Sequence, residues 1–234
     1  MDKRIASEDD RPEVVLRISN VVCTFSTSCR INLRHLAMTG MNVIYKKEVG
    51  VVSMKLRQPN LTATIWSSGI VACTGCFSEE EALVGAKKVA RCLCRLGFKI
   101  KMCKFKITNV FGSCSLPFRI NVETLSASYP NNASYEPEIC PGISFRIDEI
   151  NSTVRIFQTG GLTIMAASVE NVQRAVEIVH HVAVNFQKVK DYDGELNYFS
   201  RRGNRKRTSS RTGDRPLKKM KIGNGNESGI SFRP

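Results

Sequence analysis

The chain has 234 residues, of which 42% are hydrophobic and 24% charged, a balance that is ordinary for a soluble globular protein. No apolar run approaches the roughly 20 residues that a membrane-spanning helix needs, and the charged start MDKRIASEDD lacks the apolar stretch of a signal peptide. We therefore expect a cytosolic or nuclear protein without a membrane partner. The formal net charge of +14 favours a polyanionic partner, most often nucleic acid, because neutralised phosphates release their counterions.

The nine cysteines are expected to be reduced thiols, since no secretory signal accompanies them. Only Cys73 with Cys76, and Cys92 with Cys94, have spacings that suggest zinc, and both pairs fall inside strand or helix patterns. Small buried thiols are the better interpretation. We predict no metal and no cofactor.

After a flexible N-terminus at residues 1–13, residues 14–22 alternate as a strand rich in β-branched side chains. A short helix is predicted around residues 32–38, followed by strands at 49–56, 62–66 and 71–74 that turn-forming residues separate. A longer helix then begins at the capping pair Ser78 and Glu81 and stops at Gly97.

The same order of elements then returns. Residues 16–22, Leu-Arg-Ile-Ser-Asn-Val-Val, are echoed 89 residues later by Phe-Lys-Ile-Thr-Asn-Val-Phe at 105–111, and 65–69 are echoed 91 residues later at 156–160. Further strands are expected near 143–147, 154–157 and 162–166, before a helix at 169–186. Two copies indicate a duplicated fold rather than an open repeat array.

Short turns between neighbouring strands favour antiparallel pairing, with helices only at two places in each copy. We predict an α+β fold: a pseudo-two-fold saddle from two tandem repeats, with one curved antiparallel sheet and helices on its convex face. The saddle domain is expected to span 14–190, with repeat one at 14–104 and repeat two at 105–190. A basic disordered tail is expected at 191–234.

The predicted tail holds eleven Lys or Arg and five acidic residues. Its two clusters resemble a bipartite nuclear-import signal, with a Ser/Gly-rich spacer. The alternative is a nonspecific solubilising or DNA-tethering tail. The import residues would be Arg205, Lys206, Arg207, Lys218, Lys219 and Lys221.

Several motifs together resemble the TATA-box-binding protein family over residues 14–190. They are Ser-Tyr-Glu-Pro-Glu at 134–138 before Pro141-Gly142, Ser68-Gly69 with Cys73-Thr-Gly75, Leu96-Gly-Phe98, Phe105-Lys-Ile107 with Asn109, and Gly112-Ser-Cys114. Residues 63–69 and 42–46 are more similar to the TBP-like branch. The resemblance implies a transcription factor whose concave face meets the DNA minor groove.

In the family, four phenylalanines wedge between base steps. The matching positions are Val49, Trp66, Cys140 and Phe157. Val and Cys fill little of the gap between unstacked bases, and unstacking costs a few kcal/mol per step. We therefore expect strong TATA binding to be lost.

On the floor of the saddle, the resemblance implies that Asn20, Asn109 and Thr74 keep the family's hydrogen-bonding types, and that Lys55 and Arg146 remain basic. Arg155 replaces an apolar groove-facing residue and would favour a narrow minor groove. Lost phosphate-contacting cations at other positions would lower affinity and flatten its salt dependence. The DNA-facing set is completed by Val22 and Phe111.

The partner-binding surfaces implied by the resemblance are a turn and a helix. Glu136, Glu138 and Ile139 match the segment that engages transcription factor IIB, whereas Ala37, Asn42 and Arg57 match positions for transcription factor IIA. The first long helix carries a basic face for acidic regulators such as IIA, made of Lys87, Lys88, Arg91 and Arg95. Without the resemblance, such a face is usually just solvated.

Together these features predict a nuclear, non-enzymatic factor that binds IIA and IIB and serves promoters without a TATA box. The alternative is a direct minor-groove binder with changed sequence preference. An enzyme is the third possibility, but His35, His180 and His181 form no catalytic constellation and no phosphate-binding glycine loop is present. No small-molecule substrate is expected.

Overall fold

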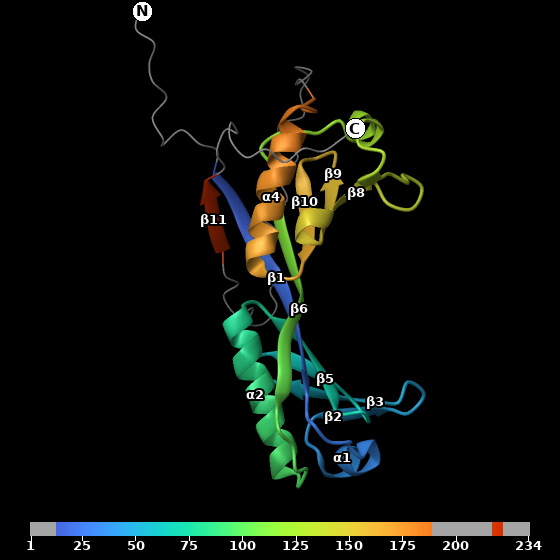
Figure 1. The fold of residues 1–234 in the computed structure, drawn as a ribbon, viewed down its shortest axis with the longest axis vertical. Helices are drawn as coiled ribbons and strands as arrows, with labels where there is room; N and C mark the ends of the chain where they lie inside the picture. Colours follow the sequence, from blue (N-terminus) through green and yellow to red (C-terminus); the bar gives the residue numbers. More distant parts are fainter. Residues whose placement is uncertain (1–12, 189–216, 222–234) are drawn as a thin grey trace, which may run out of the picture.

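The computed structural model describes residues 13–188 and 217–221 (Figure 1). Its strands lie in one antiparallel sheet of order β2-β3-β4-β5-β1-β6-β10-β9-β8-β7. The first copy supplies β1 (Glu13–Ser26), α1 (Leu33–Thr39), β2 (Val43–Lys46), β3 (Val51–Leu56), β4 (Leu61–Trp66), β5 (Ile70–Cys76) and α2 (Glu79–Arg95). The second supplies β6 (Cys103–Ser115), α3 (Val122–Ser128), β7 (Ala133–Ser134), β8 (Gly142–Ile147), the 3-10 helix η2 (Asp148–Ile150), β9 (Ser152–Phe157), β10 (Gly161–Ala166) and α4 (Val169–Val184).

The predicted α+β saddle is confirmed, because both copies contain the same elements around a curved, open sheet. The short strands β2 and β7 at the two sheet edges were not predicted from the alternation of residues. The expected strand at 49–56 begins only at Val51, and Val49 lies in the preceding turn.

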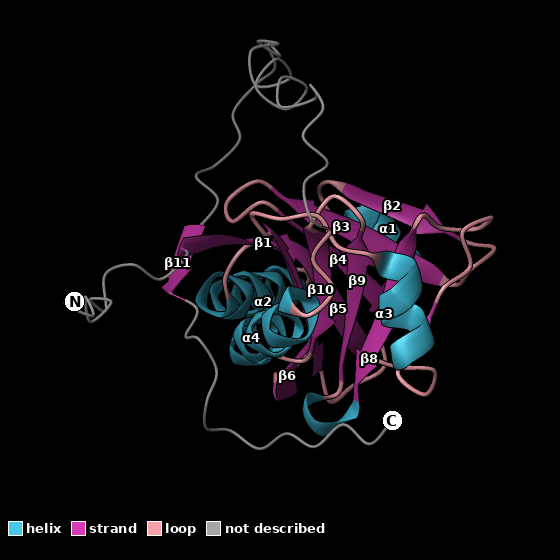
Figure 2. Ribbon diagram, turned by 90° about the horizontal axis from the view of Figure 1, so that it is seen from above, coloured by secondary structure: helices cyan, strands magenta, loops and turns pink. Residues whose placement is uncertain are grey.

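Helices α2 and α4 lie on the same, convex face of the sheet (Figure 2), and they follow one another along the long axis of the molecule (Figure 1). Each begins at a serine whose hydroxyl accepts a backbone N–H: Ser78 from Glu81 at 3.0 Å, and Ser168 from Asn171 at 3.1 Å. Such caps satisfy one of the donors that a helix start leaves unpaired. The apolar faces of these helices pack on the alternate residues of the strands, so the core lies between helices and sheet.

Two equivalent turns, after β4 and after β9, require glycine. Gly69 and Gly160 both have a φ of +86°. A Cβ added to Gly69 would lie 2.1 Å from Cys29 O, and one added to Gly160 would lie 2.3 Å from Phe118 O. The repeated glycine therefore lets each turn pack against the backbone that follows the first strand of its repeat.

The two copies are joined at the centre of the sheet by β1 and β6, which pair from Arg17 opposite Ser113 to Ser26 opposite Cys103. The helices also meet: a carboxylate oxygen of Glu79, in the first turn of α2, accepts the backbone N–H of Val169 at 2.9 Å. This acidic side chain thus lies near two helix starts, where negative charge is favourable.

A further strand, β11 (Leu217–Lys221), pairs with the first residues of β1, from Glu13 opposite Lys221 to Arg17 opposite Leu217. Met220 in this strand is 8% exposed and belongs to the core. The prediction of a disordered tail is therefore wrong for these five residues. The start of β1 has a free edge with which β11 can pair, and Met220 adds an apolar side chain to the core there. Among the described residues, no helix is long and apolar enough to cross a membrane.

Candidate nucleic-acid interface

The centre of the concave face is formed by β1 and β6, where two predicted pairs meet. Asn20 lies opposite Phe111, and Val22 lies opposite Asn109. Register shifts in β1 on either side of these residues interrupt the regular pairing, and such bulges re-aim side chains. All four side chains are half-buried, so the structure brings together the two asparagines that the repeat singled out.

The two asparagines differ in their partners. Asn20 Nδ2 lies 3.1 Å from Thr74 Oγ1, and Asn20 Oδ1 accepts the N–H of Gly75 at 2.8 Å. Within the described residues, no side-chain hydrogen bond of Asn109 is found, and the residue that corresponds to Thr74 in repeat two is Met165. The prediction that Thr74 faces the floor is compatible with this contact, which sequence reasoning did not foresee.

The four wedge candidates lie at the two ends of the saddle. Val49 is 70% exposed in the turn before β3, and Trp66 is 36% exposed opposite the first residue of β3, Val51. At the other end, Cys140 and Phe157 are half-buried, and Phe157 lies opposite Gly142. Each end therefore holds one aromatic candidate and one small or aliphatic candidate.

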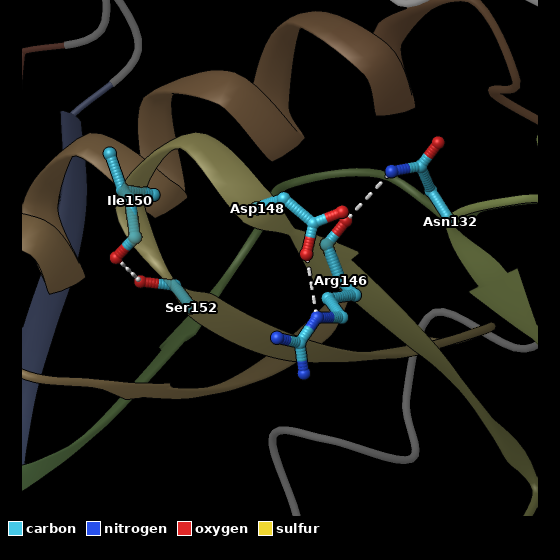
Figure 3. A network of polar contacts seen from close by, with 5 residues as sticks. All are labelled: Asn132, Arg146, Asp148, Ile150 and Ser152. Carbon is cyan, nitrogen blue, oxygen red and sulfur yellow. Dashed lines mark hydrogen bonds and ion pairs between the residues drawn. The ribbon is translucent and has the colours of Figure 1, made fainter.

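The basic candidates Lys55, Arg146 and Arg155 are all exposed. Arg146 Nε donates to Asp148 Oδ1 at 2.6 Å, and Asn132 Nδ2 donates to the Arg146 carbonyl (Figure 3). Asp148 therefore offsets part of the charge that Arg146 would offer a phosphate, a contact that the sequence did not reveal. Lys55 and Arg155 have no ion pair within the part of the chain that the structure describes.

The candidate positions for transcription factor IIA fall on two neighbouring surfaces of repeat one. Ala37 lies on α1, Asn42 precedes β2 with a φ of +55°, and Arg57 follows β3. Lys87, Arg91 and Arg95 are exposed on α2, while Lys88 Nζ donates to the carbonyl of Gln58. After Glu81, α2 has four Lys or Arg and no Asp or Glu, so the exposed side of this helix is basic.

The candidate segment for transcription factor IIB is a compact turn between β7 and β8. The Glu136 carbonyl accepts the N–H groups of Ile139 and Cys140 at 3.0 and 2.9 Å. Glu136 and Glu138 are exposed, and Ile139 is 80% exposed. The turn thus presents two carboxylates and one apolar side chain to solvent.

The candidate import residues divide between two regions. Arg205, Lys206 and Arg207 lie outside the described residues, whereas Lys218, Lys219 and Lys221 lie in β11.

The cysteines of the described segments are free thiols. Burial raises the pKa of Cys76 and of Cys114 to about 12, and a hydrogen bond with Cys23 together with burial raises that of Cys73. In residues 13–188 and 217–221, no three His, Cys, Asp or Glu side chains gather in a way that could hold a metal ion.

A saddle of two repeats, with no acidic side chain at its centre, an exposed Trp66 at one end and a half-buried Phe157 at the other, is a surface that can face the minor groove of DNA. The family model described as "Transcription factor TFIID (or TATA-binding protein, TBP)" matches residues 15–96 and 104–183. The chain therefore belongs to the TATA-binding protein family and is a TBP-like transcription factor.

The relatives agree with this assignment. TATA box-binding protein-like 1 of Danio rerio is 47% identical over 171 residues, 73% of this chain and 92% of that protein. The TATA-box-binding protein of Acanthamoeba castellanii is 34% identical over 190 residues, 80% of this chain and 74% of that protein. The solved structure of Methanococcus jannaschii TBP has a TM-score of 0.63 at 29% identity, covering 73% of this chain and 98% of that one. The chain is thus more similar to the TBP-like relative, as the motifs predicted.

Proposed function

We propose that this protein is a nuclear scaffold for transcription initiation by RNA polymerase II at promoters without a TATA box. It binds transcription factors IIA and IIB through the surfaces of repeat one and of the Glu136 turn, and it binds TATA DNA weakly. The observation that carries the proposal is the contrast between the two kinds of surface. Val49 and Cys140 are poor wedges, whereas Arg91, Glu138 and their neighbours are exposed for partners.

The energetic argument concerns bending. A wedge contributes only if its contacts offset the few kcal/mol that each unstacked step costs. Val49 and Cys140 offer small side chains at two of the four positions, and Asp148 weakens the phosphate contact of Arg146. Binding of a protein partner requires no bending of DNA. The small residues at the wedge positions and the Arg146–Asp148 pair therefore leave the partner-binding surfaces of this chain unaffected.

The test is a salt-titrated binding comparison between a TATA duplex and a scrambled duplex, with and without factor IIA. The proposal expects equal, weak and salt-sensitive binding to both duplexes, together with a stable complex with IIA. Preferential TATA binding with a pronounced bend would refute it, because the small wedges would then suffice.

Arg155 favours a second candidate function, direct minor-groove binding with a changed sequence preference. A guanidinium on the floor suits a narrow, A·T-rich groove. A selection from random duplexes separates the two candidates: enrichment of a common sequence supports the direct binder, whereas its absence supports the scaffold.

Nuclear import through Arg205–Arg207 and Lys218–Lys221 is part of the proposal, and is supported by the basic composition of both clusters. Replacement of each cluster by alanine in a fluorescent fusion tests it, since import should fall when either cluster is lost.

A further inference from the structure

The first residues of β1 extend beyond the strands that flank the rest of it. β5 pairs with β1 only along residues 21–26, and β6 pairs with it only from Arg17 onward. Arg17 lies opposite Ser113 of β6 and also opposite Leu217 of β11, so β11 occupies the edge opposite β6. Within the part of the chain that the structure describes, residues 13–16 therefore have β11 as their sole partner strand.

One apolar side chain adds to the backbone pairing of β11. Met220 lies opposite Val14 and is 8% exposed, and both Val14 and Leu16 are buried in the core. Lys219, the residue before Met220, is exposed. One face of β11 therefore lies on the core, and one of its edges pairs with the start of β1 (Figure 1).

The same five residues contain the second cluster of the proposed import signal, Lys218, Lys219 and Lys221. Proteins that bind extended segments use main-chain hydrogen bonds for affinity and side-chain pockets for specificity. Successive side chains of an extended segment point to opposite sides, so a receptor that reads adjacent lysines has to reach both faces of the segment. Docked β11 has one face and one edge covered, so β1 and a receptor cannot hold it at the same time.

β11 is held by fewer contacts than the inner strands of the sheet. It has five residues, and among the described strands it pairs with β1 alone. Segments with few buried contacts open locally at a much lower free energy than core strands do. β11 can therefore leave the edge of β1 without unfolding of the saddle.

We propose that residues 13–17 of β1 form a strand-binding edge that docks β11 and hides the second import cluster, so that an import receptor with an acidic groove binds only undocked β11. This inference rests on the proposed nuclear import and adds its regulation. The apparent affinity of the receptor is scaled by the fraction of chains in which β11 is undocked. By linkage, a bound receptor has to free the edge of β1.

The first experiment removes docking without changing the import cluster. Val15 lies opposite Lys219, is 44% exposed, and precedes the first pair of β1 with β6. Val15→Pro places a residue without a backbone N–H in the docking edge and should leave the ladder with β6 intact. The purified import receptor for basic signals should then bind the full-length chain about tenfold more tightly, the gain expected when docking holds about nine chains in ten. Val15→Thr keeps the N–H and the branched side chain, and should bind like the wild type.

A second variant separates lost docking from the change at position 15. Met220→Ser removes the buried side chain but keeps all three lysines, and it should also tighten receptor binding. Met38→Ser, the same change at an exposed site on α1, should not. Hydrogen exchange at residues 217–221 reports docking in each variant, and exchange at residues 14–16 of the wild type should rise when the receptor binds.

A reversible lock tests the converse. Residues 15 and 219 are direct partners, and opposed Cα atoms of an antiparallel pair lie about 4.5–5.5 Å apart, within the range that a disulfide spans. Val15→Cys combined with Lys219→Cys should form this bond with oxidised glutathione, and mass spectrometry of the digested chain identifies it among the other thiols. The oxidised chain should bind the receptor at least about tenfold more weakly than the same chain after reduction.

Three outcomes separate this inference from the import proposal. Unchanged receptor affinity in Val15→Pro and Met220→Ser, with rapid exchange at residues 217–221 in both, overturns the inference while the import signal stands. Equal receptor binding by the oxidised and reduced forms of the lock variant also overturns it. If alanine at positions 218, 219 and 221 leaves receptor binding unchanged in the Met220→Ser chain, the import signal itself is wrong and the inference falls with it.

Discussion

Asn20 and Thr74 are joined across two neighbouring strands, with Asn20 Nδ2 3.1 Å from Thr74 Oγ1. The contact ties β1 to β5 at a point where the pairing register shifts between Val21 and Cys23. This hydrogen bond therefore holds two strands of repeat one together, and Met165 cannot form its equivalent in repeat two.

Replacement of Thr74 by Met, the residue of repeat two, should lower the free energy of unfolding by about 0.5–1.5 kcal/mol, because one intramolecular hydrogen bond is lost. Urea unfolding followed by circular dichroism measures the change. The control is Thr62→Met on the adjacent strand, where the half-buried threonine has no side-chain hydrogen bond within the described residues. An equal loss in both variants would show that the hydrogen bond contributes nothing.

Phenylalanine at the two candidate wedge positions that now hold small side chains should restore bending of TATA DNA. Val49→Phe combined with Cys140→Phe should tighten binding to a TATA duplex by about tenfold, since larger rings offset part of the few kcal/mol that each unstacked step costs. Fluorescence anisotropy gives the affinity, and energy transfer between dyes at the duplex ends gives the bend. Met38→Phe, at a position that is 86% exposed on α1, should change neither quantity.

Reversing the charge of one proposed partner surface should weaken binding of its own partner and leave binding of the other partner unchanged. Lys87→Glu, Arg91→Glu and Arg95→Glu together should weaken factor IIA binding by at least about tenfold, while stability changes by only about 0.5 kcal/mol per exposed site. Glu136→Lys with Glu138→Lys should instead weaken factor IIB binding. Pull-down with each purified factor measures both effects, and loss of both partners in either variant would contradict separate surfaces.

His180 should make stability depend on pH. Its side chain is 5% exposed, its Nδ1 has no hydrogen-bond partner among the described residues, and burial together with the charge of His181 lowers its pKa. The unfolded chain binds this proton more readily, so stability is complete above the ordinary histidine pKa of about 6.5 and falls as pH decreases below it. Urea unfolding between pH 7.5 and 5.5 should show this loss, and His180→Leu should show less of it. The exposed His35→Gln should behave like the wild type.

Pairing of β11 with β1 should protect the backbone amides of β11 from hydrogen exchange. Backbone amides of residues 217–221 should exchange slowly with deuterium in the full chain, because they pair with β1. Met220→Ser removes the buried side chain of the strand and should increase exchange at these amides by about tenfold, as expected for about 1.4 kcal/mol of lost burial. Met38→Ser, a change of the same type at an exposed site, should have no effect there. Rapid exchange in the wild type would argue against docking of the strand.

Much of the fold was predictable because its determinants are local. Alternation along β1 and β6, the serine cap of α2, and the repeated Gly69 and Gly160 are each readable within a few residues. The edge strands β2 and β7 were not predicted, because they have four and two residues, too few for a periodic pattern of apolar side chains.

The candidate site divides in the same way. The sequence by itself determined the duplication, the matched positions of Asn20 and Asn109, and the small residues at two of the candidate wedge positions, since identity and spacing suffice for these. Only the tertiary structure decided that Thr74 holds Asn20, that Asp148 pairs with Arg146, and that Met220 covers the start of β1. The physical reason is that the register and curvature of the sheet decide which side chains meet, and these follow from pairing between distant segments that local periodicity does not encode.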